Sequence, residues 1–129
     1  MTHALFRNAA AHADGFRDVD PLLLHEHRGD VRIIDVREQD EYSGELGHID
    51  GAELVPLATV PVEARGWKPD EELVVVCRSG GRSGAAARQL VQMGFTRVMN
   101  LRGGMIAYNA AKLPVDRTEA RPAAMRALS

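Results

Sequence analysis

Short apolar runs alternate with polar, glycine-containing segments along this chain of 129 residues. The run Leu73–Val76 holds four apolar residues, three of them β-branched, which is typical of a strand buried on both faces of a parallel sheet. Less regular runs at 16–19, 31–35, 53–56 and 97–100 predict four further strands, which gives five in all.

Helix signals fall between these predicted strands. Asp20-Pro21 is an N-cap followed by proline at the first helical position, and Arg28-Gly29 ends that helix with a cation and a glycine. A second helix is predicted from Ser83 to Gly94, with an apolar stripe formed by Ala86, Ala87, Leu90 and Val91. Strands that alternate with helices predict an α/β domain of three layers, α/β/α, around a five-stranded parallel sheet. Such a sheet binds ligands beyond the carboxyl ends of its strands.

Composition narrows the class of protein. With 45% hydrophobic and 26% charged residues and a net charge of −2, the chain gives no reason to expect nucleic acid or a membrane surface as a partner. No apolar run is long enough to span a membrane, and the first residues lack the hydrophobic core of a secretion signal. The one cysteine excludes an internal disulfide framework and favours a reducing compartment, so we expect a cytoplasmic protein. We expect one domain at 15–115, with an N-terminal extension at 1–14 and a polar tail at 116–129.

The single cysteine, Cys77, directly follows the predicted strand Leu73–Val76 and precedes a loop with two glycines and two arginines. Glycines allow backbone N–H groups to converge on one point, and the following helix N-terminus adds partial positive charge. Arg78 and Arg82 add full charges with donors suited to an oxyanion. A thiol ionises more readily in such surroundings, so the loop predicts a nucleophilic thiolate and an anionic substrate. The alternative is that Cys77 is a structural residue, small and buried at the end of a strand. Such a residue requires neither the glycines nor the arginines, so this alternative is disfavoured.

The segment from Cys77 to Arg82, with Ser83 opening the helix, resembles the six-residue active-site loop of the rhodanese sulfurtransferase family. Three more segments within about residues 16–115 resemble motifs of that family: Asp35-Val36-Arg37, Gly47-His48-Ile49-Asp50-Gly51-Ala52 and Leu101-Arg102-Gly103-Gly104. Met105 departs from the family pattern, in which an aromatic residue usually follows the two glycines, although Tyr108 lies one turn later. The resemblance implies a rhodanese-like fold. It also implies a cysteine that takes a sulfane sulfur from a donor, holds it as a persulfide and passes it to a nucleophilic acceptor.

The resemblance and the local chemistry together assign the site. Cys77 is the predicted catalytic residue, and we expect neither a metal ion nor a cofactor. The predicted substrate-binding residues are Arg78, Ser79, Gly80, Gly81, Arg82, Ser83 and Arg37. Arg37 has two interpretations, either a substrate contact at the carboxyl edge of the sheet or a brace between loops. We interpret Asp35 as a brace, because an acid beside the sulfur would oppose its ionisation. We interpret His48 as the source of a loop-bracing hydrogen bond and not as a general base.

The predicted reaction moves a sulfane sulfur from thiosulfate, or another small anionic or persulfide donor, to a thiol or to cyanide. The alternative with the same loop chemistry is a non-catalytic persulfide carrier or sensor that acts with a protein partner. A cysteine phosphatase is a third class, since it also places a cysteine in an anion-binding loop. Those phosphatases have an arginine six residues after the cysteine, where this chain has Ser83, and phosphatases related to rhodaneses use a loop one residue longer. The phosphatase hypothesis is therefore disfavoured.

Overall fold

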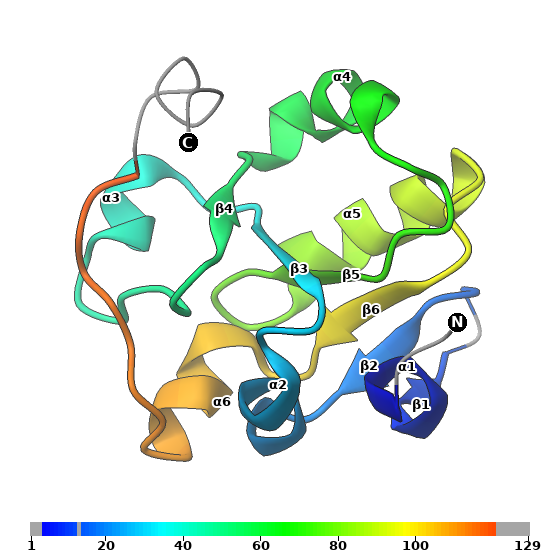
Figure 1. The fold of residues 1–129 in the computed structure, drawn as a ribbon. Helices are drawn as coiled ribbons and strands as arrows, with labels where there is room; N and C mark the ends of the chain where they lie inside the picture. Colours follow the sequence, from blue (N-terminus) through cyan, green and yellow to red (C-terminus); the bar gives the residue numbers. More distant parts are fainter. Residues whose placement is uncertain (1–3, 13, 121–129) are drawn as a thin grey trace.

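A mostly parallel β-sheet with helices on both sides forms the centre of the protein (Figure 1). The structure is a computed structural model, which describes residues 4–12 and 14–120. The strands lie in the order β1-β2-β6-β5-β3-β4. Their bounds are Ala10–Ala11 (β1), Arg17–Val19 (β2), Arg32–Asp35 (β3), Glu53–Leu54 (β4), Leu73–Val76 (β5) and Val98–Leu101 (β6).

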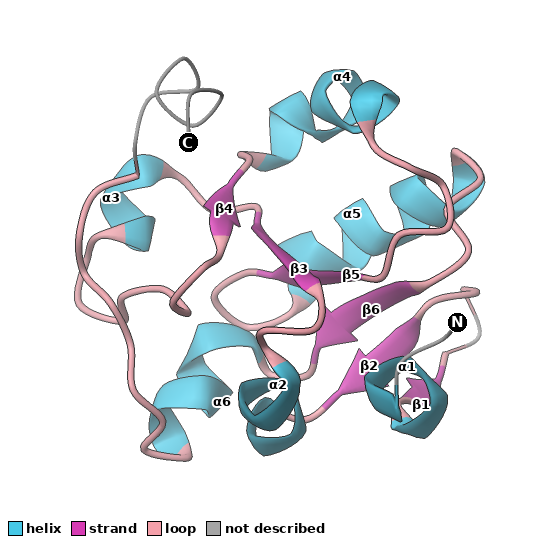
Figure 2. Ribbon diagram, viewed as in Figure 1, coloured by secondary structure: helices cyan, strands magenta, loops and turns pink. Residues whose placement is uncertain are grey.

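Helices α2, α3, α4 and α5 lie in connections between strands, whereas α1 precedes the first strand and α6 follows the last (Figure 2). The α-helices are Ala4–Asn8 (α1), Pro21–His27 (α2), Gln39–Tyr42 (α3), Val60–Glu63 (α4), Gly81–Gln92 (α5) and Gly104–Ala110 (α6). Two short 3₁₀ turns, Leu57–Thr59 (η1) and Ala64–Gly66 (η2), flank α4. Within the described residues, no helix is both long and apolar enough to cross a membrane.

Five of the six strands run parallel, which confirms the predicted parallel sheet and the α/β class. The sixth strand, β1, was not predicted; it pairs antiparallel with β2 through Ala10 opposite Asp18 and Ala11 opposite Arg17. Both alanines of β1 are exposed, so no alternation of apolar and polar positions marks them as a strand. The sheet therefore has one more strand than the sequence predicts.

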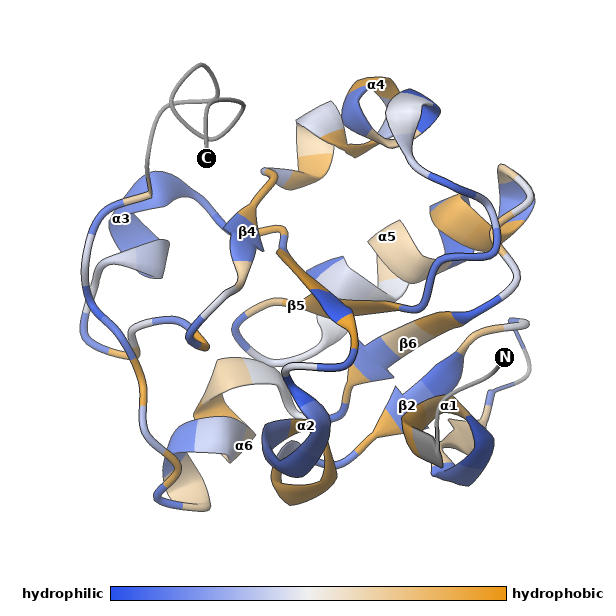
Figure 3. Ribbon diagram, in the orientation of Figure 1, coloured by the Kyte–Doolittle hydropathy of each residue, from blue (hydrophilic) through white to orange (hydrophobic). Residues whose placement is uncertain are grey.

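The two faces of the sheet carry separate hydrophobic clusters because successive side chains of a strand point to opposite faces. In β5, Val74 and Val76 face the side covered by α1, α2 and α6, whereas Leu73 and Val75 face the side covered by α4 and α5. All four side chains are at most 1% exposed. The hydrophobic colour along β5 contrasts with the hydrophilic positions in β2 and β6 (Figure 3). Strand β5 ends at Val76, and Cys77 is the next residue and is equally buried.

The segments outside the predicted domain make contacts with it. Leu5 of α1 is fully buried in the cluster that α2 and α6 cover. Asp116 exchanges two backbone hydrogen bonds with His48, at 2.7 and 2.8 Å. Residues 1–3 of the predicted extension, residue 13 and residues 121–129 of the predicted tail lie outside the described residues. We propose 15–115 as the domain; before it, α1 packs on the core and β1 adds an edge strand to the sheet.

Candidate active site

The Cys77 sulfur is buried in a ring of hydrogen-bond donors. Cys77 is 1% exposed, and its Sγ lies 3.0 Å from the backbone nitrogen of Gly80 and 3.3 Å from the hydroxyl oxygen of Ser83. Burial on its own raises the pKa of the thiol. Hydrogen bonds from the Ser83 side chain and from the backbone N–H groups of Ser83, Gly80 and Ser79 outweigh that effect, so the pKa of Cys77 lies below its ordinary value.

The turn at Gly80 aims these donors. Gly80 has a φ of +108°, a conformation that residues with a Cβ rarely adopt, and it serves as the N-cap of α5. Helix α5 begins at Gly81 and not at Ser83 as predicted, so Gly81 and Arg82 belong to its first turn. The backbone N–H groups that reach the sulfur are those of Ser79, of the N-cap Gly80 and of Ser83 in this first turn.

Helix α6 holds the opposite side of the same loop. The carbonyl oxygens of Cys77 and Arg78 accept hydrogen bonds from the backbone N–H groups of Met105 (2.9 Å) and Ile106 (3.0 Å). A carbonyl and the N–H of the next residue point in opposite directions, so these bonds direct the loop N–H groups toward the sulfur. The contact requires Gly104, because a Cβ at that position would lie 2.5 Å from the backbone of Cys77 and Arg78.

The two loop arginines differ in their partners. Arg78 is exposed, and its guanidinium makes no hydrogen bond or ion pair with the described residues. Arg82 forms a bidentate ion pair with Glu41 of α3, at 2.7 and 2.8 Å. The hydrogen bond from Arg82 lowers the pKa of Glu41 to about 2, and the same contact raises the pKa of Arg82. Of these two loop cations, Arg82 is paired with a carboxylate, whereas Arg78 has no such partner among the described residues. A substrate-binding role stays a prediction for both.

The model of the Rhodanese-like domain family matches residues 18–111 of this sequence. This chain is a member of the rhodanese-like family. A protein of Allochromatium vinosum named sulfurtransferase is 38% identical over 86 residues, which cover 67% of this chain and 78% of that protein. A Bacillus subtilis protein, YrkF, whose name suggests a sulfur carrier, is 40% identical over 75 residues, which cover 58% of this chain and 40% of that protein. The crystal structure of a rhodanese-related protein from Thermoplasma volcanium superimposes with a TM-score of 0.73 at 25% identity, covering 80% of this chain and all of the other.

In this rhodanese-like domain the Arg37 side chain is 1% exposed and its guanidinium donates four hydrogen bonds. Its guanidinium donates to both carboxylate oxygens of Asp35, at 2.7 and 2.9 Å, and to the carbonyl oxygens of Gly47 (2.6 Å) and Glu41 (3.2 Å). The brace expected of Asp35 is therefore present. These contacts favour the bracing interpretation of Arg37. Its substrate-binding role stays a prediction, since Arg37 also lines a cavity of about 270 Å³ together with Arg78.

His48 braces the loop between α3 and β4, as predicted. Its ring is stacked on that of Tyr42, with ring centroids 3.6 Å apart, and its Nδ1 donates to the Tyr42 carbonyl oxygen at 2.9 Å. Met105 and Tyr108 are both fully buried and belong to the hydrophobic core. The Tyr108 hydroxyl lies 3.1 Å from His25 Nδ1, so Tyr108 does not take the place of the missing aromatic residue at the pocket wall.

Sequence reasoning missed two members of the site, Glu41 and Asn100. Asn100 of β6 lies with its Oδ1 2.5 Å from the Ser83 hydroxyl oxygen, and its Nδ2 donates to Asp18 of β2 at 3.2 Å. The signal for Asn100 was a polar residue inside the apolar run Val98–Leu101, at a position that is 7% exposed. Glu41 carried no comparable signal, because its partner lies 41 residues away in the sequence.

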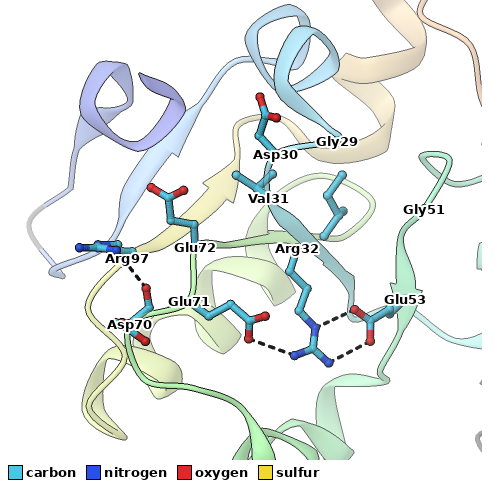
Figure 4. Close-up of a pocket in the computed structure, with 11 residues that line it drawn as sticks. Gly29, Asp30, Val31, Arg32, Gly51, Glu53, Asp70, Glu71, Glu72 and Arg97 are labelled. Carbon is cyan, nitrogen blue, oxygen red and sulfur yellow. Dashed lines mark hydrogen bonds and ion pairs between the residues drawn. The ribbon is translucent and has the colours of Figure 1, made fainter. Parts of the chain in front are cut away.

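A larger cavity, of about 550 Å³, lies at the other end of the sheet, near the start of β3 and β5 (Figure 4). Arg32 crosses it and binds Glu53 through two nitrogens and Glu71 through a third. The charge of Arg32 in this cavity is therefore balanced by Glu53 and Glu71. Among the described residues, no group of His, Cys, Asp and Glu side chains is arranged to hold a metal ion.

Proposed function

We propose that this rhodanese-like protein is a sulfurtransferase that carries a sulfane sulfur as a persulfide on Cys77. The observation that supports this most is the set of donors around Sγ, the Gly80 N–H at 3.0 Å and the Ser83 hydroxyl at 3.3 Å, at a helix N-terminus. These groups stabilise a sulfur anion. The membership of the rhodanese-like family and the sulfurtransferase name of the Allochromatium vinosum relative support the same reaction.

The proposed reaction has two displacements at sulfur. The Cys77 thiolate attacks the outer sulfur of thiosulfate; a new S–S bond forms, the old one breaks, and sulfite leaves with the electron pair. The terminal sulfur of the persulfide then carries the negative charge that the loop N–H groups of Ser79, Gly80 and Ser83 would stabilise. A nucleophilic acceptor, a thiolate in the cell or cyanide in an assay, attacks that terminal sulfur and releases the Cys77 thiolate. Both displacements balance without a metal ion or a cofactor.

The exposed Arg78 would attract the sulfonate oxygens of the donor. Arg82 and Ser83 contribute to the proposed site in a different way, because Arg82 is bound to Glu41 and Ser83 touches the sulfur itself. A small anionic donor and a thiol acceptor are the proposed partners. We place the protein in the cytoplasm, since the lone cysteine has to be reduced in order to act as the nucleophile.

The test is the intact mass of the protein after incubation with thiosulfate and removal of the excess. We expect a gain of one sulfur atom that maps to Cys77, is removed by cyanide and is absent from Cys77→Ser. The control is Ser129→Ala, a change at the last residue of the sequence, and this variant should gain sulfur as the parent does. No gain with thiosulfate, glutathione persulfide or a persulfidated protein would refute the proposal.

The second candidate is a sulfur carrier that exchanges persulfide only with a protein partner. The name of YrkF, which is 40% identical over 75 residues, favours it. The two functions differ in rate: a carrier would load slowly from thiosulfate and rapidly from a persulfidated protein. Equal or faster turnover with thiosulfate would exclude the carrier.

A further inference from the structure

The Ser83 hydroxyl has one hydrogen and faces three acceptors. Asn100 Oδ1 lies at 2.5 Å, whereas the Cys77 sulfur and the Gly80 carbonyl oxygen both lie at 3.3 Å. A hydroxyl donates one hydrogen bond at full strength, and its own lone pairs accept others. By distance, the hydrogen belongs to Asn100. The Ser83 oxygen is then left to accept a hydrogen bond from the thiol S–H of Cys77.

The orientation of the Asn100 amide is fixed by its other neighbour. Asn100 on β6 is paired in register with Asp18 on β2, and its Nδ2 lies 3.2 Å from the Asp18 carboxylate. A carboxylate only accepts hydrogen bonds, so the amide nitrogen has to face Asp18 and the amide oxygen has to face Ser83. The chain of contacts runs from Asp18 through Asn100 and Ser83 to Cys77, across two strands and one helix.

We propose that Asn100 is a positioning residue that takes the Ser83 hydrogen while Cys77 is a thiol and releases it when the sulfur becomes an anion. Ionisation of Cys77 requires the Ser83 hydrogen to turn to Sγ, which leaves the amide oxygen of a residue that is 7% exposed without that bond. Asn100 therefore opposes ionisation and offsets part of the effect of the loop N–H groups. In the persulfide of the proposed function the inner sulfur carries no charge, so the hydrogen returns to Asn100.

The competition between Asn100 and Cys77 for the Ser83 hydrogen can be tested without changing the ion pairs around the thiol. The ionic groups near the loop, which come from the loop itself and from α5, α3 and the end of β3, are Arg78, Arg82, Glu41, Arg37 and Asp35. The hydrogen bonds of Arg82, Glu41, Arg37 and Asp35 go to one another and to backbone groups, whereas Asn100 is bound to Asp18. A substitution at Asn100 consequently changes the partner of Ser83 and leaves the ion pairs Asp35–Arg37 and Glu41–Arg82 in place.

The experiment measures the rate of Cys77 alkylation by iodoacetamide against pH, which reports thiolate without a contribution from another cysteine. Asn100→Ala should lower the apparent pKa of Cys77 by about one unit, and so raise the alkylation rate about tenfold at a pH below the pKa. Ser83→Ala should raise the pKa. The double variant should match Ser83→Ala alone, because Asn100 acts only through the Ser83 hydrogen.

Asp18→Asn provides the same test without a change inside β6, in case Asn100→Ala does not fold. It allows the Asn100 amide to turn its nitrogen toward Ser83, and it also removes a negative charge, which acts with or without Ser83. The pKa of Cys77 should therefore fall further in the parent than in the Ser83→Ala background. An unchanged or raised pKa in Asn100→Ala would overturn the proposal. So would a shift of the same size with and without Ser83. Alkylation requires no sulfur transfer, so failure of the sulfurtransferase proposal would leave this result intact.

Discussion

The close contact between α6 and the Cys77 loop predicts that Gly104→Ala damages both stability and thiol reactivity. Gly104 has a φ of +60°, and a Cβ there would lie 2.5 Å from the carbonyl oxygens of Cys77 and Arg78. Ordinary van der Waals contact begins at 3.4 Å, so the helix and the loop would have to separate by roughly 1 Å. Such a separation breaks the hydrogen bonds from Met105 and Ile106 that orient the loop.

The magnitude follows from three costs. A left-handed conformation costs an alanine about 1 kcal/mol, and overpacking a tight contact costs about 1–3 kcal/mol. Each of the two backbone hydrogen bonds contributes about 1 kcal/mol, part of which is regained from water. These effects overlap because one movement relieves the clash and breaks the bonds. We expect Gly104→Ala to lower the free energy of unfolding by about 3 kcal/mol, and the thiol pKa to rise as the loop N–H groups turn away.

Urea unfolding followed by circular dichroism measures the first effect, and the pH dependence of iodoacetamide alkylation measures the second. The matched control is Gly51→Ala, because Gly51 has a φ of +88° but an added Cβ there would meet open space within 4 Å. Both substitutions reduce the freedom of the unfolded chain equally. The control therefore isolates the cost of the backbone conformation, about 1 kcal/mol. Unfolding free energies that agree between the two variants, together with unchanged alkylation, would refute the argument that α6 orients the loop.

Three further predictions concern the charged groups. Asp35→Asn leaves Arg37, which is 1% exposed, without its anionic partner and should lower the denaturant-derived free energy of unfolding by about 3–5 kcal/mol. Glu41 has a folded pKa of about 2, below its ordinary value of 4.5, so its carboxylate stabilises the fold above about pH 4.5 and that contribution is lost as the pH falls toward 2. The free energy of unfolding, measured by denaturant titration between pH 2 and pH 7, should therefore fall less steeply toward acid in Glu41→Gln than in the parent. The difference should be less than about 1 kcal/mol, because the pair with Arg82 is partly exposed. Arg78→Ala should raise the thiosulfate KM about fivefold at nearly unchanged kcat, because an exposed ion pair with the substrate contributes about 1 kcal/mol to binding. Equal kcat/KM values for the variant and the parent in steady-state assays would contradict this role.

The sequence predicted the parts of the fold that depend on local pattern. Four apolar residues at 73–76 mark β5, and Asp20-Pro21 marks the start of α2, where the backbone of Asp20 is extended as an N-cap requires. The position of Cys77 beside a helix N-terminus followed from the same local signals. Strand β1 was missed because two exposed alanines have no pattern, and its existence depends on the neighbouring edge of β2.

The contacts that tune the thiol could not be predicted in this way, because they join distant segments. Glu41 meets Arg82 only after α3 is placed beside α5, and Asn100 meets Ser83 only across the sheet. The Gly103-Gly104 segment resembled a family motif, yet the reason for Gly104 is the approach of the loop carbonyls. The sequence therefore indicated the nucleophile, and the tertiary structure adds the groups that set its protonation and charge.

The charge balance at the loop fits the proposed reaction better than a site with two available cations would. Sulfite leaves after the first displacement and an anionic product after the second, so each turnover has to release an anion twice. Two uncompensated guanidinium groups would attract the donor strongly and also retain these products. We infer that the bidentate pair with Glu41 weakens the attraction of Arg82 for these products, whereas the exposed Arg78 has no anionic partner among the described residues. One exposed cation is enough to attract an oxyanion, and its exposure to water keeps that attraction weak.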